Sequence, residues 1–383
     1  MTDREDRPGR RVFLYSERYF SFSYGMNHPL KIDRLRLTYE LCQAYGLFDL
    51  ADSQLMESEP ASEAEVLRFH TRSYLEALKQ ASKGQLSSSR VHGLGYGDNP
   101  VFPGLWEWSL LHTGASLQGA RLLSEGKARL AFNIAGGLHH ALADRASGFC
   151  YLNDPVVAIH HFLEKGMRVL YLDIDAHHGD GVQWAFYHSP EVLTVSFHQD
   201  GRSLFPGTGS VSESGQGRGA GYAVNIPMLP GADDEVFLRG FRTLVPPLMD
   251  RFQPDVIVSQ LGVDSLREDP LASLELTTNG FAEAVAMLLE FNLPLLALGG
   301  GGYHIFNVAR AWTLAWAIMN QVEIPDTLPP HWPHNPGLYQ SVSKTLRDQP
   351  HRSTGHERCA RYMDECLSYL TEHVLPLISK DTG

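Results

Sequence analysis

The chain has 383 residues, of which 43% are hydrophobic and 20% are charged, a balance typical of a globular protein with a large core. Its net charge of -12 argues against general affinity for nucleic acid or anionic membranes and weakly favours a cationic substrate. The charged first residues lack the apolar segment of a secretory signal, and no apolar run approaches the roughly 18 residues of a membrane span. Four cysteines without a CxxC pair fit a reducing compartment, so we expect a cytoplasmic protein.

Short apolar runs alternate with amphipathic segments along the chain. Strands are predicted at Val12–Tyr15, Leu130–Ile134, Val169–Ile174, Val192–Phe197, Ala223–Ile226, Val256–Leu261 and Leu295–Leu298. Between them, helices are predicted at segments that include Glu63–Lys79, Leu105–Ser124, Pro155–Glu164, Glu235–Asp250 and Gly280–Phe291. Continuous Val, Ile and Leu runs are typical of strands covered on both faces, and the alternation favours a parallel sheet between two helical layers.

Two segments are predicted to be irregular. Asp200–Gly221 is rich in Gly and Ser and is predicted to be a long loop. Loops of this length in compact domains are often functional. Pro325–Pro336 is a proline-rich connection to a last helix near His356–Leu377. We expect one catalytic domain over residues 1–383, with a core of about residues 12–320 and a C-terminal extension over 321–383.

Polar or glycine-rich sequence follows four of the predicted strands. These segments are AGGLHHA, DAHHGDG, GVDS and GGGGYH, in chain order. Ligands of open α/β sheets bind beyond the carboxyl ends of the strands, where these segments would meet. The four strand ends are therefore the predicted functional site.

The segment DAHHGDG suggests a metal site. Asp173, Asp175 and His177 have the spacing i, i+2, i+4, so an extended backbone would point them to one face, and carboxylate with imidazole suits zinc. Asp264 could complete a set of three ligands that leaves a fourth position for water or substrate. The alternatives are an Asp-rich turn in which Asp180 caps a helix through Gln183–Tyr187, and an ordinary loop aspartate at 264.

The other strand ends carry histidines and a tyrosine. His139 and His140 follow two glycines and cannot share one face, so each needs its own partner, for which Asp173 and Asp180 are candidates. The alternative is a pair of histidines packed in a turn. The run Gly299–Gly302 lacks GK[ST] and does not complete GxGxxG, so a nucleotide site is weakly supported. The glycines instead would let Tyr303 reach inward and donate to a substrate oxygen, unless it is an ordinary core tyrosine.

DAHHGD also has the DxHxxD pattern of dimanganese ureohydrolases. A second metal would require a second paired set of carboxylates. Around Asp264, position 262 is Gly and position 266 is Leu, so no second DxD is present. One metal is the predicted count.

Taken together, AGGLHHA, SGFCYLND, LDIDAHHGDGVQ, FPGTG, LGVDSL and GGGGYHIFNVARAW resemble the zinc-dependent histone deacetylase family. The likeness is to its class I branch and to bacterial acetoin-utilisation relatives, and it runs from about Tyr24 to about Ile318. The resemblance implies the arginase/deacetylase fold, a single α/β domain around an eight-stranded parallel sheet. It also implies hydrolysis of Nε-acyl-lysine amides in proteins or peptides by an enzyme that binds one Zn²⁺ or Fe²⁺.

The resemblance assigns roles to residues by motif. The metal ligands would be Asp175, His177 and Asp264. His139 would pair with Asp173 and give electrostatic support, His140 would pair with Asp180 and act as general base and acid, and Tyr303 would polarise the acyl carbonyl. The substrate channel would use Asp98, Gly148, Phe149, Phe205 and Leu271. One structural K⁺ would use Asp173, Asp175, His177, Ser196 and Phe197, and a second site is possible near Phe186, Ser189, Val192 and Tyr222.

One departure from the family concerns its regulation. Class I members that need an inositol phosphate and a corepressor carry arginines where this chain has Phe306 and Pro270, so we expect neither partner. Two rival hypotheses stay open at this point. One is a deacetylase of acetylpolyamines or another small-molecule amide on the same site, and the other is a non-catalytic protein that binds acyl-lysine.

Overall fold

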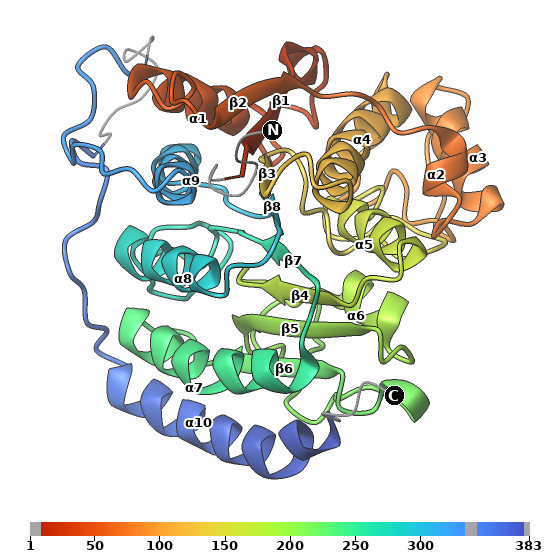
Figure 1. The fold of residues 1–383 in the computed structure, drawn as a ribbon. Helices are drawn as coiled ribbons and strands as arrows, with labels where there is room; N and C mark the ends of the chain where they lie inside the picture. The colour runs from red at the N-terminus through yellow and green to blue at the C-terminus, as the bar shows by residue number, and fades with distance from the viewer. Residues whose placement is uncertain (1–8, 334–342, 379–383) are drawn as a thin grey trace, which may run out of the picture.

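A computed structural model describes residues 9–333 and 343–378 of the chain (Figure 1). One sheet holds eight strands in the order β2-β1-β3-β8-β7-β4-β5-β6, and every pair is parallel. The strands are β1 Arg11–Tyr15, β2 Ser53–Glu57, β3 Leu130–Asn133, β4 Val169–Asp173, β5 Val192–Gln199, β6 Ala223–Met228, β7 Val256–Gln260 and β8 Leu295–Leu298. The predicted fold class, an α/β domain around an eight-stranded parallel sheet, is confirmed.

Seven of the strands are the predicted ones, and β2 is the strand that the sequence did not reveal. Its sequence, SQLME, has no continuous apolar run. β2 lies at the edge of the sheet, where it pairs with β1 and no second strand, and all five of its residues are at least partly exposed. An edge strand buries little surface, so its sequence does not need the continuous apolar run by which the other seven strands were recognised.

Helices cover both faces of the sheet (Figure 1). One layer holds α1 Asp33–Ala44, α7 Asp234–Phe252, α8 Thr278–Glu290 and α9 Ile305–Met319, and the other holds α4 Leu105–Ser124, α5 Asp154–Glu164 and α6 Asp180–Phe186. Successive side chains of a strand point to opposite faces of the sheet and so join two different apolar clusters. Phe13 packs with the cluster that contains Trp316, whereas Val12 and Leu14 belong to the other. Burial on both faces explains the continuous apolar runs.

The predicted helix Glu63–Lys79 is wrong as a single element. The structure has two helices there, α2 Glu63–Val66 and α3 Arg72–Ser82. Thr71 caps α3 by accepting a hydrogen bond from the backbone N–H of Tyr74. In the break, the buried ring of His70 accepts a hydrogen bond from the backbone N–H of Asn153, at 3.0 Å. A contact across 83 residues of sequence thus lies in the break, next to the local cap Thr71.

The C-terminal segment packs on the sheet domain. α10, His356–Tyr369, lies against α7 and β6, and the chain continues through a π turn and a 3-10 turn to Leu377 (Figure 1). Pro376 lacks a backbone N–H, which fits the loss of regular α-helix ahead of it. Residues 334–336 of the predicted proline-rich connection lie outside the described residues, and the predicted domain boundaries stay a prediction.

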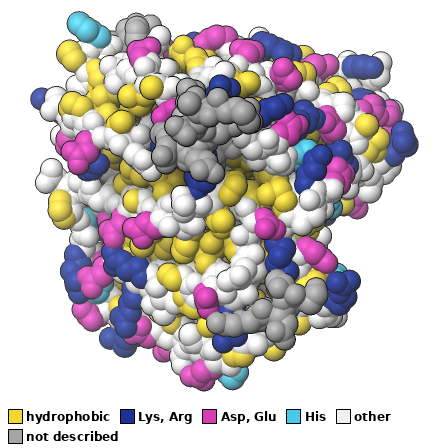
Figure 2. Space-filling view, viewed as in Figure 1, with side chains coloured by type: hydrophobic (Ala, Val, Ile, Leu, Met, Phe, Trp, Pro, Cys, Tyr) yellow, Lys and Arg dark blue, Asp and Glu magenta, His cyan; other side chains and the backbone are white. Residues whose placement is uncertain are grey.

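The surface mixes charges of both signs. On the face shown in Figure 2, acidic and basic side chains are interspersed around apolar side chains near the middle. The net charge of -12 is therefore not gathered into one acidic patch on this face. Within residues 9–333 and 343–378, no helix combines the length and the apolar character that a bilayer crossing requires. All four cysteines are buried free thiols.

Candidate active site

The four chemistry-bearing segments meet because their strands are neighbours. β3, β8, β7 and β4 are consecutive in the sheet, and parallel pairing brings their carboxyl ends to one edge. AGGLHHA, GGGGYH, GVDS and DAHHGDG follow these strands in that spatial order. The convergence predicted from the sequence is thus a consequence of strand order.

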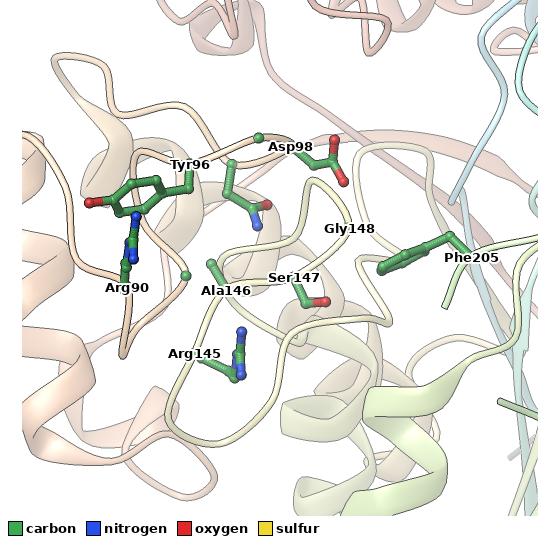
Figure 3. Close-up of a pocket in the computed structure, with 11 residues that line it drawn as sticks. Arg90, Tyr96, Asp98, Arg145, Ala146, Ser147, Gly148 and Phe205 are labelled. Carbon is green, nitrogen blue, oxygen red and sulfur yellow. The ribbon is translucent and has the colours of Figure 1, made fainter. Parts of the chain in front are cut away.

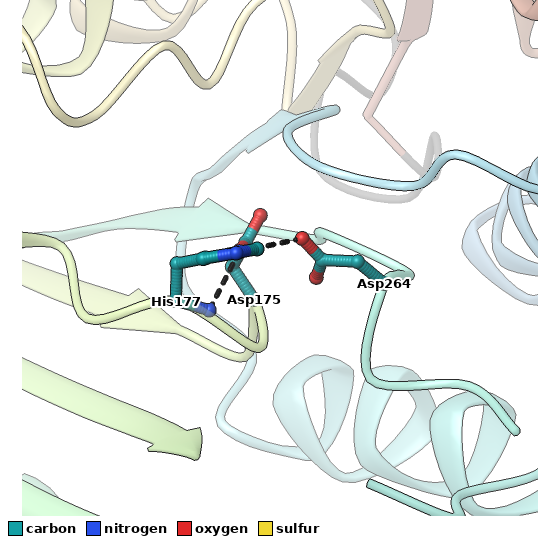
Figure 4. Close-up of side chains that lie close together, drawn as sticks. All are labelled: Asp175, His177 and Asp264. Atoms are coloured by element: carbon teal, nitrogen blue, oxygen red, sulfur yellow. Dashed lines mark hydrogen bonds and ion pairs between the residues drawn. The ribbon is translucent and has the colours of Figure 1, made fainter. Parts of the chain in front are cut away.

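Asp175, His177 and Asp264 form a buried cluster (Figure 4). One potential ligand atom from each lies within 4.8 Å of the others. His177 Nδ1 lies 2.9 Å from Asp264 Oδ2 and 3.1 Å from Asp175 Oδ1. Asp173 stands outside this cluster, because β4 ends at Asp173 and the chain turns, with the N–H of Asp175 donating to Asp173 Oδ1. The inference that extended spacing points all three to one face was therefore wrong.

The cluster fits a divalent cation. Burial and the Asp175 carboxylate raise the pKa of Asp264 to about 7, against the opposing effect of His177, because two carboxylates repel each other in a poorly solvated site. Backbone N–H groups hold the carboxylates from outside: Gly301 donates to Asp175 Oδ2 and Ala176 donates to Asp264 Oδ1, each at 2.7 Å. Two carboxylates and one imidazole are a donor set that zinc accepts, with room for a fourth ligand.

Glycines make this arrangement possible. A Cβ at Gly262 would lie 2.1 Å from Asp175 Oδ2, and one at Gly301 would lie 2.1 Å from Asp264 Oδ2. Both distances are far inside van der Waals contact, so a side chain at either position would displace a carboxylate. The glycines of GVDS and GGGGYH therefore shape the cluster.

His139 and His140 each have the aspartate partner that was predicted. His139 Nδ1 lies 2.7 Å from Asp173 Oδ2, and His140 Nδ1 lies 2.7 Å from Asp180 Oδ1. The two Nε2 atoms are 3.0 Å apart. Asp180 does not cap α6, whose N-cap is Gly179, so the alternative interpretation of Asp180 as a helix cap is wrong.

The pKa values of the two histidines are shifted in opposite directions. Burial lowers the pKa of His139, but Asp173 and Asp175 outweigh it and raise that pKa to about 9. Burial and the neighbouring His139 lower the pKa of His140 to about 4, against the opposing pull of Asp180. One imidazolium beside one neutral imidazole fits an Nε2–Nε2 distance of 3.0 Å, which leaves His140 Nε2 as the acceptor at neutral pH.

Tyr303 is positioned through an aspartate that the sequence analysis missed. Asp269 accepts hydrogen bonds from the backbone N–H of Tyr303, at 2.7 Å, and of Leu271, at 2.9 Å. Its carboxylate thereby ties the loop after β7 to the loop after β8. Burial raises the pKa of Tyr303 well above its ordinary value, and Asp264 and Asp175 add to this, so the phenol stays protonated. The only sequence signal for Asp269 was its place five residues after Asp264.

The reactive groups face one inner cavity of about 20 Å³. Its lining includes His139, His140, Asp175, Tyr303, Gly148 and Phe149. An outer pocket of about 480 Å³ shares Gly148 with it and is lined also by Asp98 and Phe205. Leu271, predicted at the rim, is half-buried and lies outside the lining of both cavities.

Aromatic rings pack around Gly148, the residue that the two cavities share, and we call this junction the passage. The Phe205 ring packs edge-on against His140 at 5.0 Å between centroids, and the Phe149 ring packs edge-on against Tyr303 at 5.6 Å. Gly148 has φ of +49°, and a Cβ there would lie 2.5 Å from His140 Cδ2 and 2.8 Å from the Phe205 ring. The passage is therefore as tight as a glycine allows, which suits a slender, unbranched chain.

His178, to which the sequence analysis gave no role, anchors the loop that carries Phe205. Its Nδ1 lies 2.8 Å from the hydroxyl of Thr208, and its Nε2 lies 3.1 Å from Gln183 Oε1. Gln183 in turn donates to Glu213, which accepts the N–H of Gly209. The predicted long loop Asp200–Gly221 is confirmed as irregular apart from the 3-10 turn Gly217–Gly219, and this buried network fixes it beside the passage.

The predicted potassium positions lie around the ends of β4 and β5. Asp173 is opposite Ser196 in the sheet register, and the Ser196 hydroxyl lies 2.9 Å from His198 Nδ1. At the second position, the Phe186 carbonyl accepts the N–H of Ser189. Potassium at either place stays a prediction.

The chain is similar in sequence to known proteins. Residues 28–319 match the model of the histone deacetylase domain. Histone deacetylase B of Dictyostelium discoideum is 43% identical over 324 residues, which are 84% of this chain and 76% of that protein. Human histone deacetylase 1 is 42% identical over 320 residues, which are 83% of this chain and 66% of that protein.

Solved structures agree with the sequence relatives. The crystal structure of an HDAC homologue from Aquifex aeolicus has a TM-score of 0.85 and 34% identity, with 94% of this chain and 100% of that chain covered. The structure of an HDAC homologue complexed with SAHA gives the same values. The predicted bacterial acetoin-utilisation branch stays a prediction. The chain therefore belongs to the histone deacetylase family and is a deacetylase-type hydrolase.

Proposed function

We propose that this protein is a zinc-dependent hydrolase that removes acetyl or related acyl groups from Nε-acyl-lysine side chains of proteins or peptides. The observation that carries the proposal is the inner cavity. It brings His139, His140, a carboxylate of the metal cluster and Tyr303 to one small space at the end of a narrow passage. A lysine side chain is a slender chain of the kind that such a passage admits, and its acyl amide would reach the reactive groups.

Asp175, His177 and Asp264 would hold the metal, as Zn²⁺ or, in the cell, Fe²⁺. When bound, zinc supplies Lewis-acid polarisation of the acyl carbonyl and makes water more acidic. His140 Nε2 accepts the proton of the attacking water, because its other nitrogen is engaged by Asp180. His140 then returns this proton to the leaving lysine amine, and the charge of His139, 3.0 Å away, favours the release because it lowers the pKa of His140. Tyr303 donates to the developing oxyanion.

The mouth of the passage weighs against acetylpolyamines. Arg90 and Arg145 line the outer pocket, where the distal ammonium of an acetylpolyamine would lie, and Asp98 is the one carboxylate in that lining. Exposed apolar side chains of Tyr96 (44% exposed) and Phe205 (43%) offer contact area to a peptide. A protein or peptide substrate fits this surface better than a small cation does. A non-catalytic acyl-lysine binder would have no use for the polarised histidine pair.

Three further predictions belong to this proposal. Potassium binds at the two positions described above. The protein needs neither an inositol phosphate nor a corepressor, because Phe306 and Pro270 stand where the dependent members carry arginines. The protein is cytoplasmic. Phe306 supports the second of these because it is buried against Trp332, with ring centroids 5.9 Å apart, instead of offering a cation to an anionic regulator.

Two substitutions test the proposal. Tyr303→Phe removes an oxyanion donor and should lower kcat on an acetyl-lysine peptide by about 10²–10³-fold. His140→Ala removes the general base and should lower it by about 10²–10⁴-fold. Both variants should bind zinc as the wild type does, which metal analysis checks. Near wild-type turnover by either variant would show that the assigned role is wrong.

Two comparisons on the wild type separate the rival substrates and mechanisms. An acetyl-lysine peptide should be hydrolysed faster than N-acetylputrescine at equal concentration, and the reverse order would favour the polyamine alternative. A hydroxamate should inhibit turnover by binding the metal, and turnover should disappear after chelation and return with Zn²⁺. Turnover that survives removal of all metal contradicts the proposed mechanism.

A further inference from the structure

The outer pocket contains two arginines that have no carboxylate partner within residues 9–333 and 343–378. Arg90 and Arg145 lie toward one end of the pocket, and Asp98 and Phe205 lie toward the other (Figure 3). Arg90 stands over the ring of Tyr96 at 5.4 Å from its centroid. Among the described residues, the Arg145 guanidinium makes no hydrogen bond or ion pair. Both side chains are exposed and available to a ligand.

Some exposed arginines of this acidic chain, which has 44 Asp and Glu residues against 32 Lys and Arg, pair with carboxylates. Arg239 lies 2.6 Å from Asp364, and Arg352 lies 2.6 Å from Glu235. Two unpaired guanidinium groups in one pocket create a local positive potential, and a nearby Tyr ring supports one of them without neutralising it.

The pocket lies within reach of residues that flank a bound acyl-lysine. Arg145 is three residues before Gly148, which lines both cavities, so their Cα atoms are at most about 11 Å apart. An extended substrate advances about 3.3–3.6 Å per residue, which places the side chain of a residue one to three positions from the acyl-lysine over the arginines. Arginine binds a carboxylate through two parallel hydrogen bonds, a geometry that a fixed pocket wall can select.

We propose that the outer pocket is a subsite for an acidic side chain, Asp or Glu, within three residues of the acyl-lysine of a peptide substrate. Arg145 makes the direct contact with the carboxylate, and Arg90 adds the second positive charge. Asp98, at the opposite end, stays clear of the carboxylate and is free to accept N–H groups of the substrate backbone. This subsite rests on the proposed function and names the class of substrate that it selects.

Matched peptides test the subsite. Acetyl-lysine peptides with Glu at one flanking position are compared with the same peptides carrying Gln there, at each position from three before to three after the lysine. The wild type should show a higher kcat/KM for Glu at one position or more, by about twofold to fivefold, as one or two exposed charge pairs give. Arg145→Gln should bring this ratio close to one, and Arg145→Glu should reverse it in favour of Gln over Glu.

Controls separate the subsite from the chemistry. Arg361→Gln, at an exposed position of α10, should keep the wild-type preference. A minimal substrate, Nα-acetyl-Nε-acetyl-lysine amide, has no flanking side chain and should be hydrolysed by the Arg145 variants within about twofold of the wild type. Equal use of Glu and Gln peptides at every position, or a preference that survives Arg90→Gln together with Arg145→Gln, overturns the subsite. Loss of all acetyl-lysine turnover in the zinc-loaded wild type would instead overturn the proposed function.

Discussion

The inner site and the mouth of the passage are built in opposite ways. At the inner site, formed by His139, His140, Asp175, His177 and Asp264, every side chain is buried and hydrogen-bonded to another. At the mouth, formed by Arg90, Tyr96, Asp98, Arg145 and Phe205, the side chains are exposed, and several are long and flexible.

The difference has an energetic consequence. Electrostatic interactions are strong at the inner site, where water is excluded, and are screened at the mouth. A change at the inner site should therefore alter the chemical step by orders of magnitude. A change at the mouth should alter the choice of substrate by small factors and leave the chemical step intact.

Asp180→Asn should give the largest effect, a fall in kcat. An Asn amide no longer holds His140 with its proton on Nδ1, so Nε2 loses its place as proton acceptor. We expect kcat to fall by about 10²–10⁴-fold, by analogy with the loss of an orienting aspartate in other His-dependent hydrolases. Metal content should stay at the wild-type level, because Asp180 lies outside the cluster. A fall of less than about fivefold would mean that Asp180 does not orient the base.

The pH dependence of metal binding should give an intermediate effect. Burial lowers the pKa of His177, but Asp264 and Asp175 outweigh it and raise that pKa to about 10 in the metal-free site. Zinc must displace this proton, so affinity should rise about tenfold per pH unit between about pH 7 and pH 9. Titration calorimetry in two buffers of different ionisation enthalpy should show one proton released. Affinity that is flat over this range contradicts the raised pKa.

The same proton affects the stability of the metal-free protein. Protonated His177 stabilises the folded state fully below its unfolded pKa of about 6.5, and this contribution is lost as the pH rises through about 10. The increase in Tm that zinc produces should therefore grow between pH 7 and pH 9. A measurement at fixed free zinc across this range gives an independent check on the calorimetry.

Asp98→Asn should give the smallest effect. Its carboxylate lies at the mouth, and its backbone carbonyl is held near His28 Nε2, at 3.2 Å. Replacing a charged acceptor by a neutral one weakens hydrogen bonds to substrate N–H groups, so KM for a peptide should rise by about threefold to tenfold. The kcat for the same peptide should change by less than twofold. A fall in kcat as large as the rise in KM would place Asp98 in the chemical step and break the contrast between the two regions.

The parts of the fold predicted from sequence are those that bury the most surface. Seven strands covered on both faces left continuous apolar runs, whereas β2 at the edge left none. The break between α2 and α3 was missed although Thr71 is a local cap, and the contact between His70 and Asn153 that occupies the break joins distant segments.

The site shows the same division. The His–Asp pairs and the three candidate metal ligands were correctly grouped from adjacent motifs and from the resemblance. Asp269 was missed because it acts through backbone N–H groups of another loop, and such a partner leaves no motif. The place of Asp173 was misjudged because the turn after β4 cannot be read from residue spacing.

The sequence by itself determined which residues could do chemistry, since glycines, histidines and aspartates after buried strands are a local pattern. Only the tertiary structure decided how they combine. Strand order made β3, β8, β7 and β4 neighbours, and the closeness of the two Nε2 atoms lets His139 lower the pKa of His140. The same folding placed Arg90 beside Arg145, 55 positions apart in the sequence, in one pocket, because long-range packing brings together residues that no local pattern connects.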